Sequence, residues 1–152
     1  MLAPPWTPRG IAQRFRAVVG HPRNLPLFVQ VGWFIATAPN RMAKTELSSF
    51  VRTLREGALR RADRGTLSRM RAFWLVRFFP RHNTCYIRAM TLYRFLQCDT
   101  GRLRLHFGIE HRSNSRERLH GHAWVSHDGS VIEGPPIAFT GGVREIVLEK
   151  SG

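Results

Sequence analysis

The sequence predicts an α+β domain, with helices first and an antiparallel sheet afterwards. Apolar side chains recur at helical spacing as far as Cys98, and the period changes to two after the turn Asp99-Thr100-Gly101. A chain of 152 residues has an ordinary length for one domain. We therefore expect a single domain with a basic, partly apolar helical region (1–40), further helices (41–98) and a sheet (99–152).

The first region predicts two helices. Pro8 to Val19 fits a short helix with Thr7 as its cap. Leu25 to Ala38 is the longest apolar stretch, but about 14 residues fall short of the roughly 20 that a membrane requires. We expect a helix that is buried or covered by a partner, and no transmembrane segment. Because Pro4 and Pro5 interrupt any signal peptide, we expect a cytoplasmic protein.

Two further helices are predicted before the first cysteine. Lys44 to Ala62 has its apolar side chains on one face and its arginines elsewhere, which indicates an amphipathic helix. After the break Asp63-Arg64-Gly65, Thr66 is the expected cap of the next helix, which runs toward Pro80. Its apolar side is formed by Leu67, Met70, Phe73, Trp74 and Phe78, an aromatic stripe typical of a core.

The stretch N-T-C-Y-I-R-A-M-T-L-Y-R-F-L, residues 83–96, predicts a helix with a cysteine at its start. Thr84 is a good cap, which places Cys85 in the first turn. There the helix dipole and the unpaired backbone N–H groups favour a thiolate. Cys98 is about 20 Å away if it lies on the same helix, so the two cysteines cannot form a disulfide. Unpaired thiols fit a reducing compartment.

The C-terminal part predicts four strands. Leu103 to Ile109 alternates apolar and polar residues, and Gly121 to His127 follows after a polar loop. Asp128-Gly129 is a two-residue hairpin signal, and Ser130 to Gly134 is the returning strand. Arg144 to Glu149 is expected to be a short last strand.

Counting from the hairpin turn places three side chains on one face of the sheet. The count pairs His127 with Ser130, Val125 with Ile132 and Trp124 with Glu133. His122, Trp124 and Glu133 then share a face, and the Glu133 carboxylate is a diagonal neighbour of the His122 ring. A bulge in the hairpin would reverse the facing of Glu133.

A cysteine at a helix start and a histidine on a strand indicate nucleophilic catalysis. Cys85 would attack a carbonyl, His122 would hold the thiolate as an imidazolium and protonate the leaving amine, and Glu133 would orient the ring. The backbone N–H of Cys85 is a natural oxyanion donor. Arg88 would support the pair or bind a substrate carboxylate, and equally fits a structural arginine.

Two more residues of the second strand belong to the predicted site. His120 is a rival base because it shares strand parity with His122. Trp124 has the same parity and is expected to support the site or to contact the substrate. In the alternative to catalysis, the protein is a scaffold and Cys85 is a small core residue.

The composition also allows nucleic-acid-binding and metal-binding functions to be considered. There are 24 Lys and Arg residues against 10 Asp and Glu, a formal charge of +14, which suits a nucleic acid, a membrane surface or an acidic partner. No recognised nucleic-acid reader motif is present, so no nucleic-acid partner is expected. His82 and Cys85, with His120 and His122, are zinc ligand types, but their spacing is not that of familiar fingers. We expect no metal and no cofactor.

Three stretches resemble a known family, the leader peptidases of lasso-peptide biosynthesis. They are C-Y-I-R-A-M-T-L-Y-R-F-L, L-R-L-H-F-G-I-E and G-H-A-W-V-S-H-D-G, within roughly residues 77–134. These peptidases are transglutaminase-like, papain-related cysteine proteases, here in the stand-alone form. The resemblance implies a transglutaminase-like fold with Cys85 as nucleophile and His122 as base. The family's acid usually sits one position after Glu133, where this chain has Gly134.

The resemblance also implies a substrate and partners. The substrate would be the leader peptide of a ribosomally made precursor, and the partners a small leader-recognition protein and an ATP-dependent macrolactam cyclase. Residues 1–40, basic and partly apolar, would be a docking surface for such proteins. A transglutaminase or acyltransferase using the same site is the related alternative.

Overall fold

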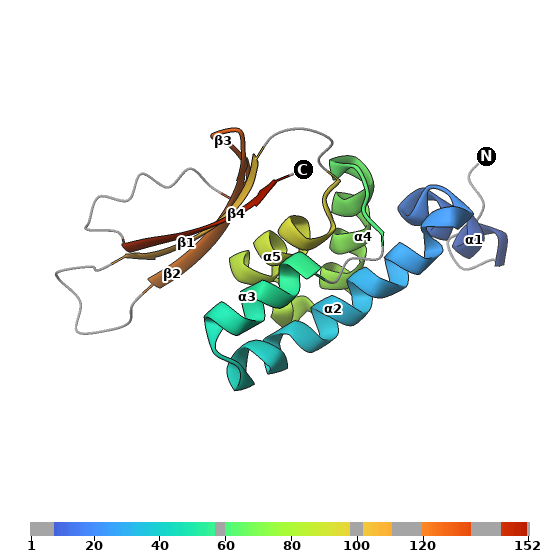
Figure 1. Ribbon diagram of the computed structural model, residues 1–152. Coiled ribbons are helices and arrows are strands. Elements are labelled where there is room, and N and C mark those ends of the chain that lie inside the picture. Colours follow the sequence, from blue (N-terminus) through green and yellow to red (C-terminus); the bar gives the residue numbers. More distant parts are fainter. Residues whose placement is uncertain (1–7, 57–59, 98–101, 111–119, 135–143, 152) are drawn as a thin grey trace.

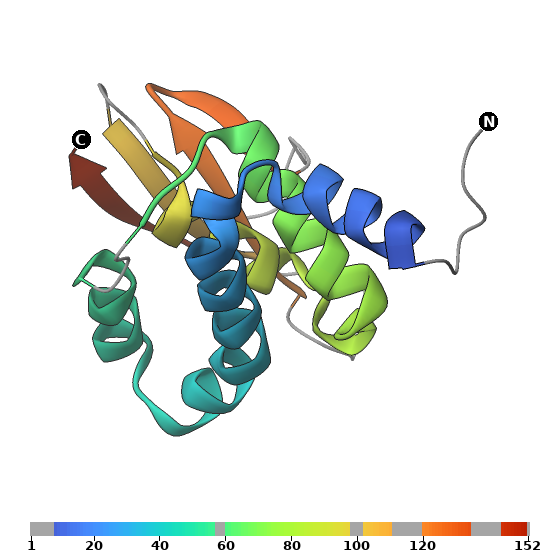
Figure 2. The same ribbon diagram turned by 90° about the vertical axis from the view of Figure 1, so that its right-hand side faces the viewer.

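The computed structural model describes residues 8–56, 60–97, 102–110, 120–134 and 144–151. Helices come first in the chain and an antiparallel sheet follows, so the predicted α+β class is confirmed. Figure 1 shows the helices gathered on one side of the sheet. In Figure 2 this helical layer faces the viewer and the sheet lies behind it.

The helical elements follow the predicted order with some changes of boundary. They are α1 (Pro8–Val19), η1 (Pro22–Asn24), α2 (Leu25–Lys44), α3 (Leu47–Glu56), α4 (Arg64–Arg77), η2 (Pro80–His82) and α5 (Cys85–Phe95). Helix α2 continues past Ala38 although Pro39 lies inside it. Within the described part of the chain, none of the helices is long and apolar enough to cross a bilayer.

Two predicted boundaries around residue 62 were wrong. The helix predicted to reach Ala62 is α3, which begins at Leu47, and Ala62 instead pairs in a parallel bridge with Leu96. The Ala62 N–H donates to the carbonyl of Phe95, so it is not used in a helix. Asp63, not Thr66, caps α4: its carboxylate accepts a hydrogen bond of 2.9 Å from the backbone N–H of Thr66. Asp and Thr both cap helices well, and pattern alone did not rank them.

Helices α2 and α4 contact each other where the Trp74 indole packs against Gly32. The Trp74 Nε1–H donates to the carbonyl of Phe28 at 3.0 Å, and a Cβ on Gly32 would lie 2.4 Å from Trp74 Cε2. The predicted apolar side of α4 is therefore in the core at Leu67, Met70 and Trp74, although Trp74 is only partly buried. Phe78 follows the end of α4 and contacts the rings of Phe73 and Trp74, but it is 57% exposed, so its expected place in the core was wrong.

The sheet has the order β3-β2-β1-β4, with all neighbours antiparallel. Its strands are β1 (Arg102–Glu110), β2 (His120–His127), β3 (Ser130–Glu133) and β4 (Arg144–Ser151). Leu105 pairs with Val125, and Phe107 with Ala123; all four side chains are buried. The ring of Tyr86 in α5 stacks on Phe107, so this is the face that α5 covers.

The β2–β3 hairpin has the predicted turn but not the predicted register. Asp128 and Gly129 have φ of 48° and 83°, the conformation that a tight type I′ turn requires. The predicted pairing of His127 with Ser130 is confirmed. A bulge shifts the register beyond it, and Val125 pairs with Glu133. The predicted pairs Val125 with Ile132 and Trp124 with Glu133 were therefore wrong.

Candidate active site

The start of α5 has the geometry that the sequence predicts. Thr84 is extended, with φ −101° and ψ 158°, and its hydroxyl accepts a hydrogen bond from the backbone N–H of Ile87. Cys85 is the first residue of the helix and is partly buried. A backbone N–H at this position has no partner within the helix, which leaves it available to an incoming oxygen. Cys98 lies outside the described residues.

The thiol of Cys85 reaches the second strand. Its Sγ lies 3.9 Å from the carbonyl oxygen of Gly121, the residue immediately before His122. The first turn of α5 and the beginning of β2 therefore meet, although they are far apart in the sequence. The cysteine and the histidine singled out from the sequence belong to these two segments.

A glycine at position 121 allows this close approach. The Tyr86 hydroxyl lies where a side chain on Gly121 would begin, because a Cβ there would be 1.7 Å from that oxygen. Burial, together with the charge of the neighbouring Cys85, raises the pKa of Tyr86. At neutral pH the hydroxyl is protonated with or without this shift, because an ordinary phenol has a pKa of about 10.

His122 and Trp124 share one face of β2, as predicted. Trp124 pairs with His106 of β1, and the two rings stack at 5.1 Å with 5° between their planes. His106 Nε2 lies 2.6 Å from the Ser126 hydroxyl. This face is opposite to the one that α5 covers, where Ala123 and Val125 lie. Cys85 thus meets the strand backbone beside His122, at a point before the stretch of β2 that pairs with β3, whereas strand alternation puts the His122 side chain on the other face. The pairing of the Cys85 thiol with the His122 ring stays a prediction.

Glu133 is bound by two arginines from the helical layer. Its Oε1 accepts from Arg88 Nη2 at 2.8 Å and from Arg88 Nε at 3.1 Å, and its Oε2 accepts from Arg71 Nη2 at 3.1 Å. Burial alone would raise the pKa of this carboxyl, but the charges and hydrogen bonds of Arg71 and Arg88 outweigh burial and hold the pKa below its usual value. The guanidinium of Arg64 also donates to the carbonyl of Ile132. Helix α4 therefore holds β3 at two points.

The bulge explains why Glu133 does not share the face of His122 and Trp124. It places Glu133 opposite Val125, on the face toward α5. The next residue, Gly134, lies against Trp124: a Cβ there would be 2.7 Å from Trp124 Cβ, and its φ is 110°. The position where the resemblance expects an acid is thus beside Trp124 and carries no carboxylate. An orienting role of Glu133 toward His122 stays a prediction.

Both Arg88 and Arg71 bind Glu133, but only Arg88 was predicted from the sequence as a site residue. Arg88 was singled out, and one of the two roles expected for it, a structural salt bridge, is what it makes with Glu133. Arg71 was missed. Its signal is present in hindsight, because it falls one turn after Leu67 on the apolar side of α4 and is 8% exposed. A buried arginine requires a partner, but the sequence does not say that the partner is 62 residues away.

A cavity of about 230 Å³ opens beside the start of α5. Thr84 and Tyr86, the two neighbours of Cys85, line it, together with Met42 and Ile87. His82 also lines it, and its Nδ1 is buried without a hydrogen bond among the described residues. The space is largely apolar and is lined by the residues on either side of Cys85, although Cys85 itself does not line it, so it suits a side chain of a bound peptide.

The residues of the zinc alternative do not form a ligand set within the described part of the chain. In the described residues, no three His, Cys, Asp or Glu side chains converge as metal ligands would. His82 belongs to η2, with its ring stacked on Phe79 at 5.5 Å. His120 pairs through its backbone with Glu110, and its side chain is outside the described part.

Comparison with known proteins agrees with this architecture. The model of the transglutaminase-like superfamily matches residues 29–144, which run from within α2 to the first residue of β4 and include all the predicted site residues. No curated protein and no solved structure gives a significant match. The superfamily contains cysteine peptidases and acyltransferases, and its members are generally catalytic. Since the match spans well over half of the chain, this protein belongs to the transglutaminase-like superfamily.

Proposed function

We propose that the protein is a cysteine peptidase that removes the leader peptide from a ribosomally synthesised lasso-peptide precursor. The observation that carries the proposal is the position of Cys85, at the first residue of α5 with its Sγ 3.9 Å from the carbonyl of the residue before His122. Superfamily membership supports the enzyme class. The choice of substrate rests on the resemblance of residues 77–134 to leader peptidases.

The proposed reaction uses groups of this chain alone. The Cys85 thiolate attacks the carbonyl carbon of the scissile peptide bond, and the backbone N–H of Cys85 stabilises the oxyanion. The C–N bond breaks as the His122 imidazolium gives its proton to the leaving amine. Water then attacks the thioester, with His122 accepting its proton, and the leader leaves as a carboxylic acid while the thiol is restored.

The surroundings of the thiol fit a peptide substrate. The cavity of about 230 Å³ beside Thr84 and Tyr86 would hold one side chain next to the cleaved bond. The Tyr86 hydroxyl lies against Gly121, whose carbonyl the Cys85 Sγ approaches, and it adds a hydrogen-bond donor to this region. The proposed partners are a small leader-recognition protein, which presents the precursor, and an ATP-dependent cyclase, which closes the released core. We propose that they act together in the cytoplasm.

The test is cleavage of the precursor in the presence of the leader-recognition protein, followed by mass spectrometry. Wild-type chain should release the leader, while Cys85→Ala and His122→Ala should lose at least about a thousandfold in rate and keep their fold. Cys98→Ala is the matched control and should cleave normally. Release of the leader by Cys85→Ala would end the proposal.

A second function, acyl transfer, uses the same site and follows from the mixed membership of the superfamily. In that reaction an amine, not water, takes the acyl group from Cys85. The mass of the product distinguishes the two, because hydrolysis adds one water to the leader fragment and transfer adds the amine. The experiment therefore includes a primary amine at high concentration in a parallel reaction.

A further inference from the structure

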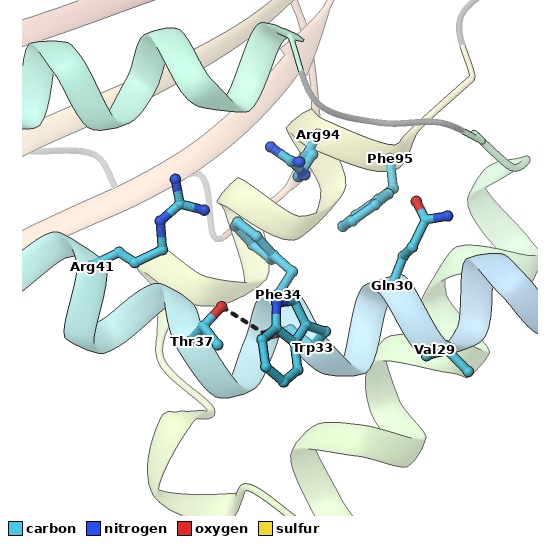
Figure 3. Close-up of a pocket in the computed structure, with 8 residues that line it drawn as sticks. All are labelled: Val29, Gln30, Trp33, Phe34, Thr37, Arg41, Arg94 and Phe95. Carbon is cyan, nitrogen blue, oxygen red and sulfur yellow. Dashed lines mark hydrogen bonds between the residues drawn. The ribbon is translucent and has the colours of Figure 1, made fainter.

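A second cavity lies away from Cys85, at the other end of α5. It has a volume of about 440 Å³ and is formed by the middle of α2 and the end of α5 (Figure 3). Trp33 and Val29, which line it, are 73% and 57% exposed, whereas Phe34 and Phe95 beneath are 4% and 1% exposed. The groove thus has a buried aromatic floor and a solvent-exposed apolar wall.

Two arginines lie at the other side of this groove. The Arg94 guanidinium donates to the Thr53 carbonyl at 2.6 Å and lies 5.4 Å from the centre of the Phe34 ring. The Arg41 guanidinium donates to the Thr53 hydroxyl at 3.4 Å. Both cations are therefore fixed near one residue of α3, and Figure 3 shows them on the same side of the groove.

The two cations also oppose each other. Burial, and then the like charge of Arg41, lower the pKa of Arg94. A carboxylate that entered the groove would offset both effects, since it would bring an opposite charge to a partly desolvated guanidinium. Tryptophan and arginine are, with tyrosine, enriched among the residues that dominate binding at protein interfaces.

The groove is separate from the candidate active site. Cys85 begins α5 and Arg94 is close to its end, which corresponds to about 14 Å along the helix axis. The groove therefore has no part in the proposed reaction, and its ligand is not the peptide bond that Cys85 would attack.

We infer that this groove docks an acidic segment of a partner protein. The segment inserts an aliphatic or aromatic side chain between Trp33 and the Phe34 floor and places carboxylates at Arg41 and Arg94. Charge complementarity selects this occupant, because the chain carries a formal charge of +14 and the groove presents two fixed cations beside apolar surface. A nucleic acid would satisfy the cations but would not need the buried aromatic floor.

The first experiment identifies the chemistry of the ligand. A random dodecapeptide library on phage is panned against the full chain and counter-selected on the Trp33→Ala variant. The enriched peptides should combine acidic residues with at least one bulky apolar residue. Enrichment of basic or uncharged peptides, or the absence of any peptide that distinguishes the two proteins, would overturn the inference.

The second experiment measures affinity with the enriched peptide by fluorescence anisotropy. Trp33→Ala and Arg41→Glu should each weaken binding by at least about tenfold. The matched controls are Val76→Ala, an exposed apolar residue of α4, and Arg52→Glu, an exposed arginine of α3; both should stay within about threefold. Circular dichroism checks that every variant is folded.

Two results of that measurement would contradict the inference. If Arg52→Glu weakens binding as much as Arg41→Glu, the peptide recognises overall charge and not the groove. If single-stranded DNA of equal charge displaces the peptide at similar concentration, the groove is a nucleic-acid surface. A peptide of the same charge without its apolar residues should bind at least about tenfold more weakly.

Discussion

The sequence predicts that the Glu133 carboxylate orients His122, whereas the structure pairs it with Arg71 and Arg88. Replacing Glu133 with glutamine distinguishes these two roles. The Glu133 side chain is 15% exposed, and the side chains of its partners Arg71 and Arg88 are 9% and 44% exposed. Removing one partner of a buried pair costs about 3–5 kcal/mol, whereas exposed pairs contribute about 0–1 kcal/mol. The contact with Arg71 therefore dominates.

We expect Glu133→Gln to lower the free energy of unfolding at pH 7 by about 3 kcal/mol. For a chain of this size that corresponds to a fall in Tm of roughly 6–12 °C. Glu46→Gln, which changes an exposed glutamate, is the matched control and should stay within about 0.5 kcal/mol of the wild type. Urea unfolding followed by circular dichroism gives both values.

The pH dependence tests the cause. The pKa of Glu133 is lower in the folded protein than its ordinary value of 4.5, so its stabilisation is complete above pH 4.5 and is lost as the pH falls through the folded value. The difference between wild type and Glu133→Gln should therefore shrink below pH 4.5. Equal stabilities at pH 7, or a difference that persists unchanged at low pH, would refute the ion-pair account. If Glu133 instead orients His122, the variant stays stable and its cleavage rate falls.

Three substitutions test the close contacts that shape the fold. Gly121→Ala should cost about 2 kcal/mol and slow alkylation of the thiol, because the new Cβ would lie 1.7 Å from the Tyr86 hydroxyl; adding Tyr86→Phe should restore part of both. Gly32→Ala should destabilise the protein by about 2 kcal/mol because Trp74 occupies the space of the new Cβ, although alanine is ordinarily favoured over glycine in a helix by about 1 kcal/mol. An unchanged or raised stability would contradict that contact. Asp63→Ala should cost about 1 kcal/mol at pH 7, and the difference should fade in acid, since its hydrogen bond to the first turn of α4 lowers the pKa of that carboxyl. Thermal unfolding at two pH values measures the three stabilities, and the iodoacetamide reaction measures the thiol.

The elements were predictable where a single local pattern decides them. The cap at Thr84 with the apolar run behind it gave the start of α5, and period-two alternation gave β1 and β2. The turn at Asp128-Gly129 was predictable because both residues tolerate positive φ. Such signals lie within a few residues of the feature that they determine.

The features that were missed depend on contacts between distant segments. The bulge in β3 moves Glu133 to the other face, and one extra residue in a strand leaves no mark in an alternating pattern of four residues. The burial of Arg71 follows from its pairing with Glu133, which sequence spacing does not reveal. The end of α3 before Ala62 follows from the bridge to Leu96.

The central claim is that Cys85 is an activated nucleophile with His122 as its proton partner. The most direct measurement is the rate of Cys85 alkylation by iodoacetamide at pH 7, resolved from Cys98 by peptide mass spectrometry, in wild type and in His122→Ala. We expect the Cys85 thiol of wild type to react at least about tenfold faster than that of His122→Ala. An equal, slow rate in both proteins would contradict the account.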